Sequence, residues 1–152
     1  MFLKMLLDIC QLLLFFAGCY YLAIALFSLT IVHREKKTDK LHSFALLVAA
    51  HNEETVVADI VKSLSELDYP KDKYKIFVVA DNCTDKTAFL AREGGAEVLE
   101  RFDETKRGKG YAMEFAFEKV FALPENYEYV CVFDADNLVK QDFLRCMNDK
   151  IN

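Results

Sequence analysis

Hydrophobic residues are distributed along this chain in two different ways, and the first is a single long run. Residues 9–32 are apolar almost without interruption and include no charged residue. These 24 residues would extend roughly 36 Å as a helix, which is enough to cross the hydrocarbon core of a bilayer with some tilt. We therefore expect a short N-terminal segment at residues 1–8 and a transmembrane helix at residues 9–32.

A cleaved signal peptide is the alternative to a retained helix. Its apolar region is normally shorter than this run. The triplet Ala17-Gly18-Cys19 resembles a lipoprotein cleavage site, but the residues after it stay apolar where a polar tether is expected. The length of the run favours a retained transmembrane helix.

From residue 44 onward, short apolar runs alternate with segments whose apolar residues recur at helical spacing. The runs predict strands at residues 44–50, 75–80, 96–100 and 129–133, and the spacing predicts helices at residues 55–67, up to residue 92, at 111–121 and from 141 to 147. This alternation is typical of an α/β fold with a doubly wound, mainly parallel sheet. The uninterrupted run at 129–133 suggests a strand buried on both faces, and the helix at 111–121 is apolar enough to be well buried.

Charge refines this picture. Residues 33–43 form a charged linker, and its cluster of lysine and arginine predicts a cytoplasmic location for everything after the helix. Within this chain, we expect a single pass through the cell membrane, with residues 44–152 in the cytoplasm. The chain contains 19 basic and 24 acidic residues, a formal charge of −5 that argues against nucleic acid as a partner. The spacing of its five cysteines matches no metal or redox motif.

Acidic residues follow three of the predicted strands. Glu53 comes after the first strand, Asp81 after the second, and Asp134 and Asp136 after the fourth. Parallel strands with right-handed crossovers bring their carboxyl ends to one edge of the sheet, so these groups should face one crevice. Two carboxylates separated by a single residue are suited to a divalent cation. Taken singly, each acid could instead cap a helix or form a turn.

The segment Arg107-Gly108-Lys109-Gly110 precedes a predicted helix at the same edge. Two glycines let the backbone approach a ligand, and two cations beside a helix N-terminus suit phosphate. A solvated basic turn is the alternative. His51 is interpreted as structural, whereas Thr84, Asp85 and Thr87 are interpreted as capping residues. Together the groups predict a site for a nucleoside diphosphate.

Four motifs in order resemble those of the family 2 glycosyltransferases, in its membrane-bound, processive-synthase-like branch. They are Val48-Ala49-Ala50-His51-Asn52-Glu53, the segment from Val78 to Thr87, Arg107-Gly108-Lys109-Gly110 and Asp134-Ala135-Asp136. The resemblance extends over about residues 44–145. Ala49, Ala80 and the pair Asn82-Cys83 depart from residues that are common in the family, but none of them removes a group assigned to chemistry.

The resemblance implies that residues 44–152 form the nucleotide-binding half of a GT-A domain. It implies transfer of a hexosyl or N-acetylhexosaminyl group from a UDP-sugar, with inversion. The acceptor is unknown: a lipid or polysaccharide is expected, and a protein is the further alternative. Glu53 and Asp81 would hold the uridine, Arg107 and Lys109 the diphosphate, and Asp134 with Asp136 the ribose and a Mg²⁺ or Mn²⁺ ion.

The family supplies its general base from a later acidic motif, which is expected beyond Asn152. The chain is therefore expected to be a truncated enzyme that is inactive alone. One alternative is a non-catalytic, membrane-tethered nucleotide-sugar-binding fragment or half of a split enzyme. Another is a haloacid-dehalogenase-like phosphatase, in which Asp134 would be a nucleophile.

Overall fold

The computed structural model describes residues 2–30 and 40–151, in two compact units that comprise residues 1–35 and 36–152. The first unit is the helix α1 (Phe2–Thr30). Within it, Lys4–Phe27 is long and apolar enough to span a membrane, although a signal sequence near an N-terminus has the same character. The helix begins earlier than the predicted residue 9, and residues 31–39, including most of the predicted linker, lie outside the described residues.

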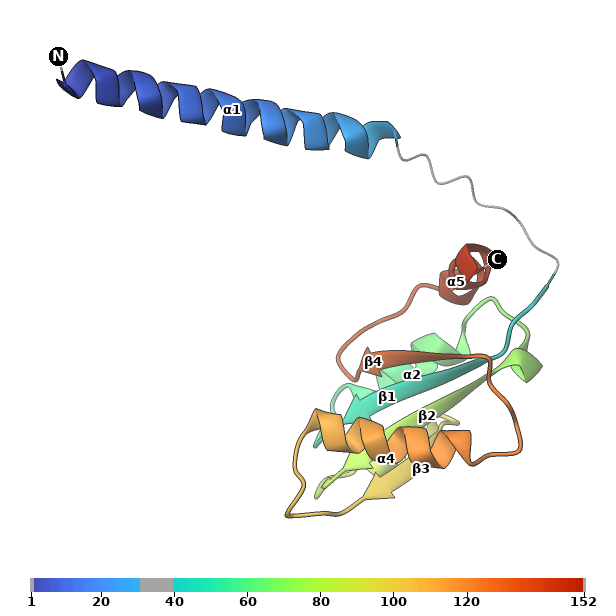
Figure 1. The fold of residues 1–152 in the computed structure, drawn as a ribbon. Coiled ribbons are helices and arrows are strands. Elements are labelled where there is room, and N and C mark those ends of the chain that lie inside the picture. The colour runs from blue at the N-terminus through green and yellow to red at the C-terminus, as the bar shows by residue number, and fades with distance from the viewer. Residues whose placement is uncertain (1, 31–39, 152) are drawn as a thin grey trace. The chain divides into compact units, whose positions relative to one another are not determined.

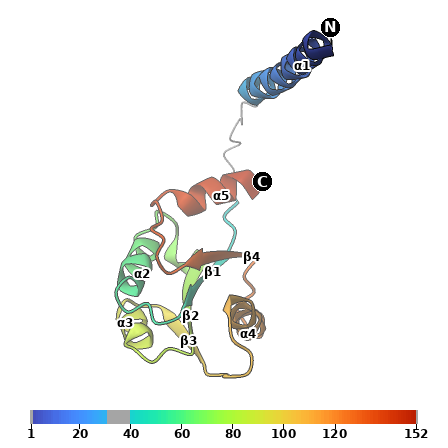
Figure 2. The ribbon, with the colours of Figure 1, turned by 90° about the vertical axis from the view of Figure 1, so that its left-hand side faces the viewer.

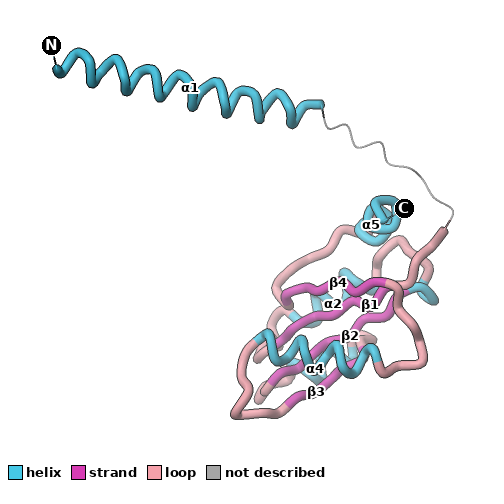
Figure 3. The backbone as a smooth tube through the Cα atoms, in the orientation of Figure 1, coloured by secondary structure: helices cyan, strands magenta, loops and turns pink. Residues whose placement is uncertain are grey.

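The second unit is built on a four-stranded sheet whose strands all run parallel (Figures 1 and 3). The strands are β1 (Phe44–Ala50), β2 (Tyr74–Asp81), β3 (Glu97–Arg101) and β4 (Tyr129–Asp134), and their order in the sheet is β3-β2-β1-β4. Each of the four predicted strands is present, with ends shifted by at most one residue. The predicted α/β class with a parallel sheet is confirmed.

Helices cover both faces of this sheet (Figure 2). The helices of this unit are α2 (Val57–Ser65), α3 (Thr87–Glu93), α4 (Lys109–Phe121) and α5 (Phe143–Ile151), with one turn of 3-10 helix, η1 (Lys71–Lys73), before β2. Helices α2 and α3 pack on one face and α4 on the other. Leu144 of α5 belongs to the same buried cluster as α2, so α5 covers that face as well.

The alternation of side chains along β1 explains these two layers. Phe44, Leu46 and Val48 face the cluster that includes α2, and Ala45 and Leu47 face the cluster that includes α4. All five are fully buried. A strand covered on both faces needs apolar residues at every position, which is what this segment of the sequence supplies.

One prediction about burial was wrong, and a second holds for one face of a helix only. The strand β4 is not buried on both faces, because it lies at the edge of the sheet and pairs with β1 alone among the described strands; its Tyr129 and Val132 are 36% and 44% exposed. A continuous apolar run does not distinguish an edge strand from an interior one. Helix α4 buries Ala112, Met113, Ala116 and Val120, whereas Phe121 is exposed.

The strand order also determines where a ligand can sit. The connections from β1 to β2 and from β2 to β3 proceed in one direction, and the return through α4 places β4 on the other side of β1. The helices that follow β1 and β3 therefore lie on opposite faces. In open α/β sheets, the crevice at such a reversal, outside the carboxyl ends of the strands, is the usual ligand site.

Candidate functional site

A cleft of about 400 Å³ opens at the carboxyl edge of the sheet, where the strand order reverses. It is formed by the ends of three neighbouring strands and the first turn of α4. Its lining comprises Ala49, Ala50, His51, Glu53, Asp81, Asn82, Arg107, Gly108, Lys109, Ala112 and Asp134. The structure thus brings together Glu53, Asp81, Arg107, Lys109 and Asp134, which the sequence analysis placed at one edge of the sheet. Asp136 is not among the lining residues.

The loop after β1 is held by contacts with the loop after β2. Asn52 has a φ of +56°, a conformation that asparagine tolerates better than most residues. The backbone N–H of Glu53 donates to Thr87 Oγ1 at 2.7 Å, and that threonine is fully buried. His51 Nδ1 donates to the carbonyl oxygen of Asp81 at 2.6 Å, which leaves its other ring nitrogen as the acceptor in the neutral form. His51 was interpreted as structural, and the structure places it in the cleft as well.

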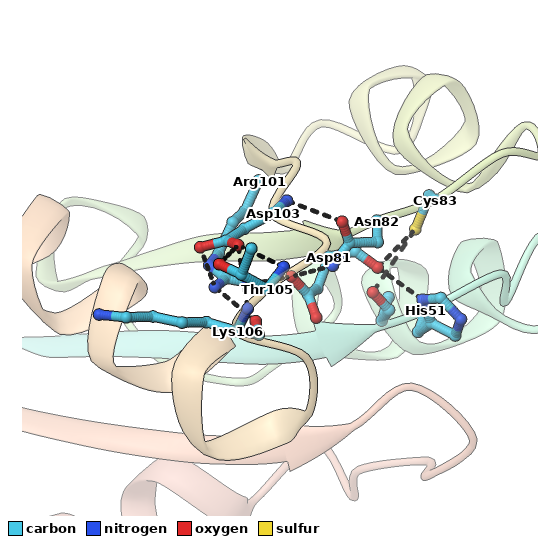
Figure 4. Close-up of polar contacts among 9 residues, drawn as sticks. His51, Asp81, Asn82, Cys83, Arg101, Asp103, Thr105 and Lys106 are labelled. Carbon is cyan, nitrogen blue, oxygen red and sulfur yellow. Dashed lines mark hydrogen bonds and ion pairs between the residues drawn. The ribbon is translucent and has the colours of Figure 1, made fainter.

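Asp81 forms a buried ion pair that the sequence analysis missed (Figure 4). Its Oδ1 accepts a hydrogen bond from Arg101 Nη1 at 2.6 Å, and the two side chains are only 9% and 8% exposed. The two residues are register partners on β2 and β3. Since a buried carboxylate without a partner is costly, Arg101 supplies the cationic partner that Asp81 needs beside the cleft.

The loop Arg107-Gly108-Lys109-Gly110 contains a backbone conformation that requires glycine. Gly108 has a φ of +113°, which residues with a side chain rarely adopt, and it directly precedes α4. The backbone N–H groups of the first helical turn have no partner within their own helix and so can bind an anion. Arg107 and Lys109, on either side of Gly108, add two positive charges to this part of the cleft.

Asp134 lies at the end of β4 and pairs with Lys109 across the cleft. The side chains of Asp134 and Lys109 are 56% and 54% exposed, so this ion pair is solvated. Asp136 is exposed on the turn that follows, where the N–H of Asn137 donates to the carbonyl oxygen of Asp134.

Among residues 2–30 and 40–151, no three His, Cys, Asp or Glu side chains gather closely enough to hold a metal alone. Mg²⁺ is commonly held by one or two carboxylates, with water and substrate phosphates completing its coordination. Asp134 and Asp136 fit a site of that kind.

The residues predicted to cap helices do make local contacts. Asp85 accepts hydrogen bonds from the N–H groups of Glu54 and Thr87 and from the Thr87 hydroxyl. Burial by itself would raise the pKa of Asp85, but these hydrogen bonds together lower it below its ordinary value. Burial raises the pKa of the Cys83 thiol, so this cysteine beside the cleft stays protonated at neutral pH. Both residues shape the loop after β2.

Comparison of the sequence with known proteins agrees with this arrangement. The family model described as Glycosyl transferase family 2 matches residues 45–152. A beta-monoglucosyldiacylglycerol synthase from Nostoc sp. is 38% identical over 105 residues, a match that covers 66% of this chain and 21% of that protein. The chain spans between 21% and 24% of the length of four curated relatives that it matches.

Solved structures share the fold. The mannosyltransferase PcManGT from Pyrobaculum calidifontis, in complex with GDP-Man and Mn²⁺, superposes with a TM-score of 0.71 at 23% identity and covers 89% of this chain and 40% of its own. TarS from S. aureus, in complex with UDP-GlcNAc, has a TM-score of 0.58 at 24% identity over 68% of this chain and 29% of its own. With its parallel sheet, its cleft at the strand reversal and a family match over most of its length, this chain belongs to glycosyl transferase family 2.

Proposed function

We propose that residues 44–152 bind the nucleotide-sugar donor, a UDP-sugar, for an inverting transfer of a hexosyl or N-acetylhexosaminyl group. The observation that carries the proposal is the convergence of Glu53, Asp81, Arg107, Lys109 and Asp134 on one cleft. Carboxylates suit the hydrogen-bond donors of a ribose and base, and two cations beside a helix N-terminus suit a diphosphate. Membership of the family argues against the phosphatase alternative.

Each side of the cleft would have its own part in binding. Asp81 and Glu53 would accept hydrogen bonds from the nucleoside. Arg107 and Lys109 would neutralise the diphosphate, which leaves with an additional negative charge when the sugar is transferred. A Mg²⁺ or Mn²⁺ ion held by Asp134 and Asp136 would stabilise that charge as a Lewis acid.

The chain's relatives and its first helix support a proposal for the acceptor and for the location. We propose that α1 anchors the protein in the cell membrane with residues 44–152 on the cytoplasmic side. The acceptor would then be a lipid or a polysaccharide made at the membrane. The similarity to a beta-monoglucosyldiacylglycerol synthase supports a lipid acceptor, and the apolar span Lys4–Phe27 supports the anchor.

Calorimetric titration of the full 152-residue chain in detergent micelles tests the donor site. We expect UDP to bind at least about tenfold more tightly with Mn²⁺ than with EDTA, which corresponds to about 1.4 kcal/mol. Asp136→Ala should abolish this difference. Asp72→Ala, which removes an exposed carboxylate at the opposite end of β2, should leave it unchanged.

Two results would contradict the proposal. One is UDP binding of equal strength with and without metal. The other is a phosphoryl group trapped covalently on Asp134, which would indicate the chemistry of a phosphatase. Titration with GDP under the same conditions reports the base preference, since the two structural neighbours described above bind GDP-Man and UDP-GlcNAc.

A further inference from the structure

The loop that joins β3 to α4 is exposed at its tip but has a defined internal structure. One carboxylate oxygen of Asp103 accepts hydrogen bonds from the N–H groups of Thr105 and Lys106, both at 2.9 Å, and from the Thr105 hydroxyl at 2.7 Å. These bonds fold residues 103–106 into a tight turn. The turn ends directly before Arg107 and Gly108, which line the cleft.

The other carboxylate oxygen of Asp103 faces the buried arginine (Figure 4). Arg101 Nη2 donates to Asp103 Oδ2 at 3.1 Å and to the carbonyl oxygen of Lys106 at 2.7 Å, while Nη1 donates to Asp81. A guanidinium group is planar, and its donors point in fixed directions. The Arg101 guanidinium therefore holds Asp81 and the turn at residues 103–106 in a fixed position relative to each other.

Asn82 makes a second connection between the same two segments (Figure 4). Its side-chain oxygen accepts from the N–H of Asp103 at 2.8 Å, and its side-chain nitrogen donates to Asp81 Oδ1 at 3.1 Å. Its own N–H donates to the carbonyl oxygen of Arg101 at 2.7 Å. Asn82 adopts a φ of +50° to make these contacts. Two independent bridges thus join the proposed nucleoside side of the cleft to the loop on the diphosphate side.

We propose that Asp103 is a positioning residue for donor binding: it holds the β3–α4 loop against Arg101 and so fixes where Arg107 and Lys109 meet the diphosphate. This inference rests on the proposed donor site. Asp103 is not itself a lining residue of the cleft, so it acts through its neighbours. Its contribution should be confined to ligands that carry phosphate.

The test compares UDP with uridine, each titrated into the full chain in detergent at one fixed Mn²⁺ concentration. Asp103→Ala should raise the dissociation constant of UDP about tenfold and that of uridine less than about twofold, because uridine lacks the diphosphate. Asp103→Asn should give an intermediate value. Its amide oxygen can still accept from Thr105 and Lys106, but it lacks the charge that pairs with Arg101.

Glu104→Gln is the matched control. Glu104 is the next residue of the same loop, is exposed, and makes no hydrogen bond or ion pair that involves the described residues. The variant therefore removes the same charge near an anionic ligand without disturbing the turn. Both dissociation constants should stay within about twofold of those of the unmodified chain.

Hydrogen exchange of the nucleotide-free chain gives a second readout. Asp103→Ala should speed exchange at Thr105 and Lys106 and through residues 107–110, whereas Glu104→Gln should not. Equal losses of UDP and uridine affinity in Asp103→Ala would overturn the inference, since they would indicate general loosening of the fold. If Asp103→Ala behaved like Glu104→Gln, the inference would also be overturned, but the proposed donor site would still stand. An unmodified chain that binds no UDP would overturn the donor site and this inference together.

Discussion

The two sides of the cleft are built differently. On the β2 side, the side chain of Asp81 is 9% exposed and pairs with a buried Arg101, which in turn contacts the next loop. On the β4 side, Asp134 pairs with Lys109, both side chains are more than half exposed, and Asp136 lies on an open turn. The first side is complete before any ligand arrives. On the second side, Asp134 and Lys109 are accessible to solvent, so each can leave the other for a different partner.

The position of each strand in the sheet accounts for this difference. The interior strand β2 has neighbours on both sides, so a charge at its end is enclosed and needs a dedicated partner. The strand β4 is at the edge, and a charge at its end remains solvated. Burial encloses the groups on one side, whereas exposure leaves the groups on the other side accessible to the proposed metal ion and diphosphate. We infer that recognition of the nucleoside is preorganised, whereas the diphosphate and metal complete their own site.

The largest effect should come from breaking the buried pair. Arg101→Met keeps much of the side-chain volume but leaves Asp81 without its cationic partner. We expect the free energy of unfolding to fall by about 3–5 kcal/mol, which is typical when one member of a buried pair is removed. Denaturant unfolding of the chain in detergent, followed by circular dichroism, measures the change.

Arg145→Met is the control for that variant. Arg145 pairs with Asp68, but these side chains are 61% and 66% exposed. Its loss should therefore cost less than about 1 kcal/mol. Similar costs for the two variants would show that the β2 side is no more tightly built than the surface. Replacing both partners, with Arg101→Met and Asp81→Leu, should recover part of the stability without recovering UDP binding.

Much of this arrangement was accessible from the sequence. The apolar run at residues 44–50 predicted β1 correctly, and the alternation of strands and helices predicted the parallel sheet. Because a parallel sheet gathers the carboxyl ends of its strands, the meeting of Glu53, Asp81, Lys109 and Asp134 could be predicted without coordinates. These inferences depend on local periodicity and on the handedness of crossovers, both of which are encoded in short segments.

The buried network was not accessible in this way. Arg101 stands in a charged stretch that is typical of a solvated loop, and only the β2–β3 register sets it opposite Asp81. Asp103 and Asn82 likewise acquire their roles from contacts between segments about 20 residues apart in the sequence. One signal was available in the sequence. Arg101 directly follows the predicted strand at 96–100, just as Asp81 directly follows the predicted strand at 75–80. For the same reason, the position of β4 at the edge could not be predicted from its composition.

The next largest effect concerns the open side. Lys109→Met should weaken UDP binding about tenfold, because a charge-assisted hydrogen bond to phosphate is lost. The free energy of unfolding should change by less than about 1 kcal/mol, since the Lys109–Asp134 pair is solvated. Without nucleotide, Mn²⁺ should bind more tightly than to the unmodified chain, because Asp134 no longer has a competing cation. Calorimetry with Mn²⁺ alone and with UDP measures both changes.

Lys62→Met provides the comparison for this variant. Lys62 is an exposed lysine on α2, away from the residues that line the cleft. It should leave both titrations unchanged. Weaker Mn²⁺ binding in Lys109→Met, or a loss of several kcal/mol in stability, would mean that the β4 side is as preorganised as the β2 side. The contrast between the two sides would then be wrong.

The smallest effect is a pH dependence that belongs to Asp103. Hydrogen bonds from the Thr105 hydroxyl and from the N–H groups of Lys106 and Thr105, with Arg101 nearby, lower the pKa of Asp103 to about 2. Because the folded-state pKa lies below the ordinary value of 3.8, this carboxylate stabilises the fold above about pH 4 and loses that contribution as the pH falls toward 2. Asp103→Asn should thus be less stable than the unmodified chain at pH 5, and the difference should shrink steadily below pH 4.

Denaturant unfolding at intervals between pH 5 and pH 2.5 measures this difference, and Glu104→Gln should show none at any pH. Other acids, such as Glu128, whose pKa is lowered by its hydrogen bond with His42, also lose stabilising contacts in this range. They do so equally in both chains, so the subtraction isolates Asp103. A difference that stays constant with pH would mean that the loop is held by its shape alone. The buried network would then end at Arg101 and would not extend to the loop that meets the diphosphate.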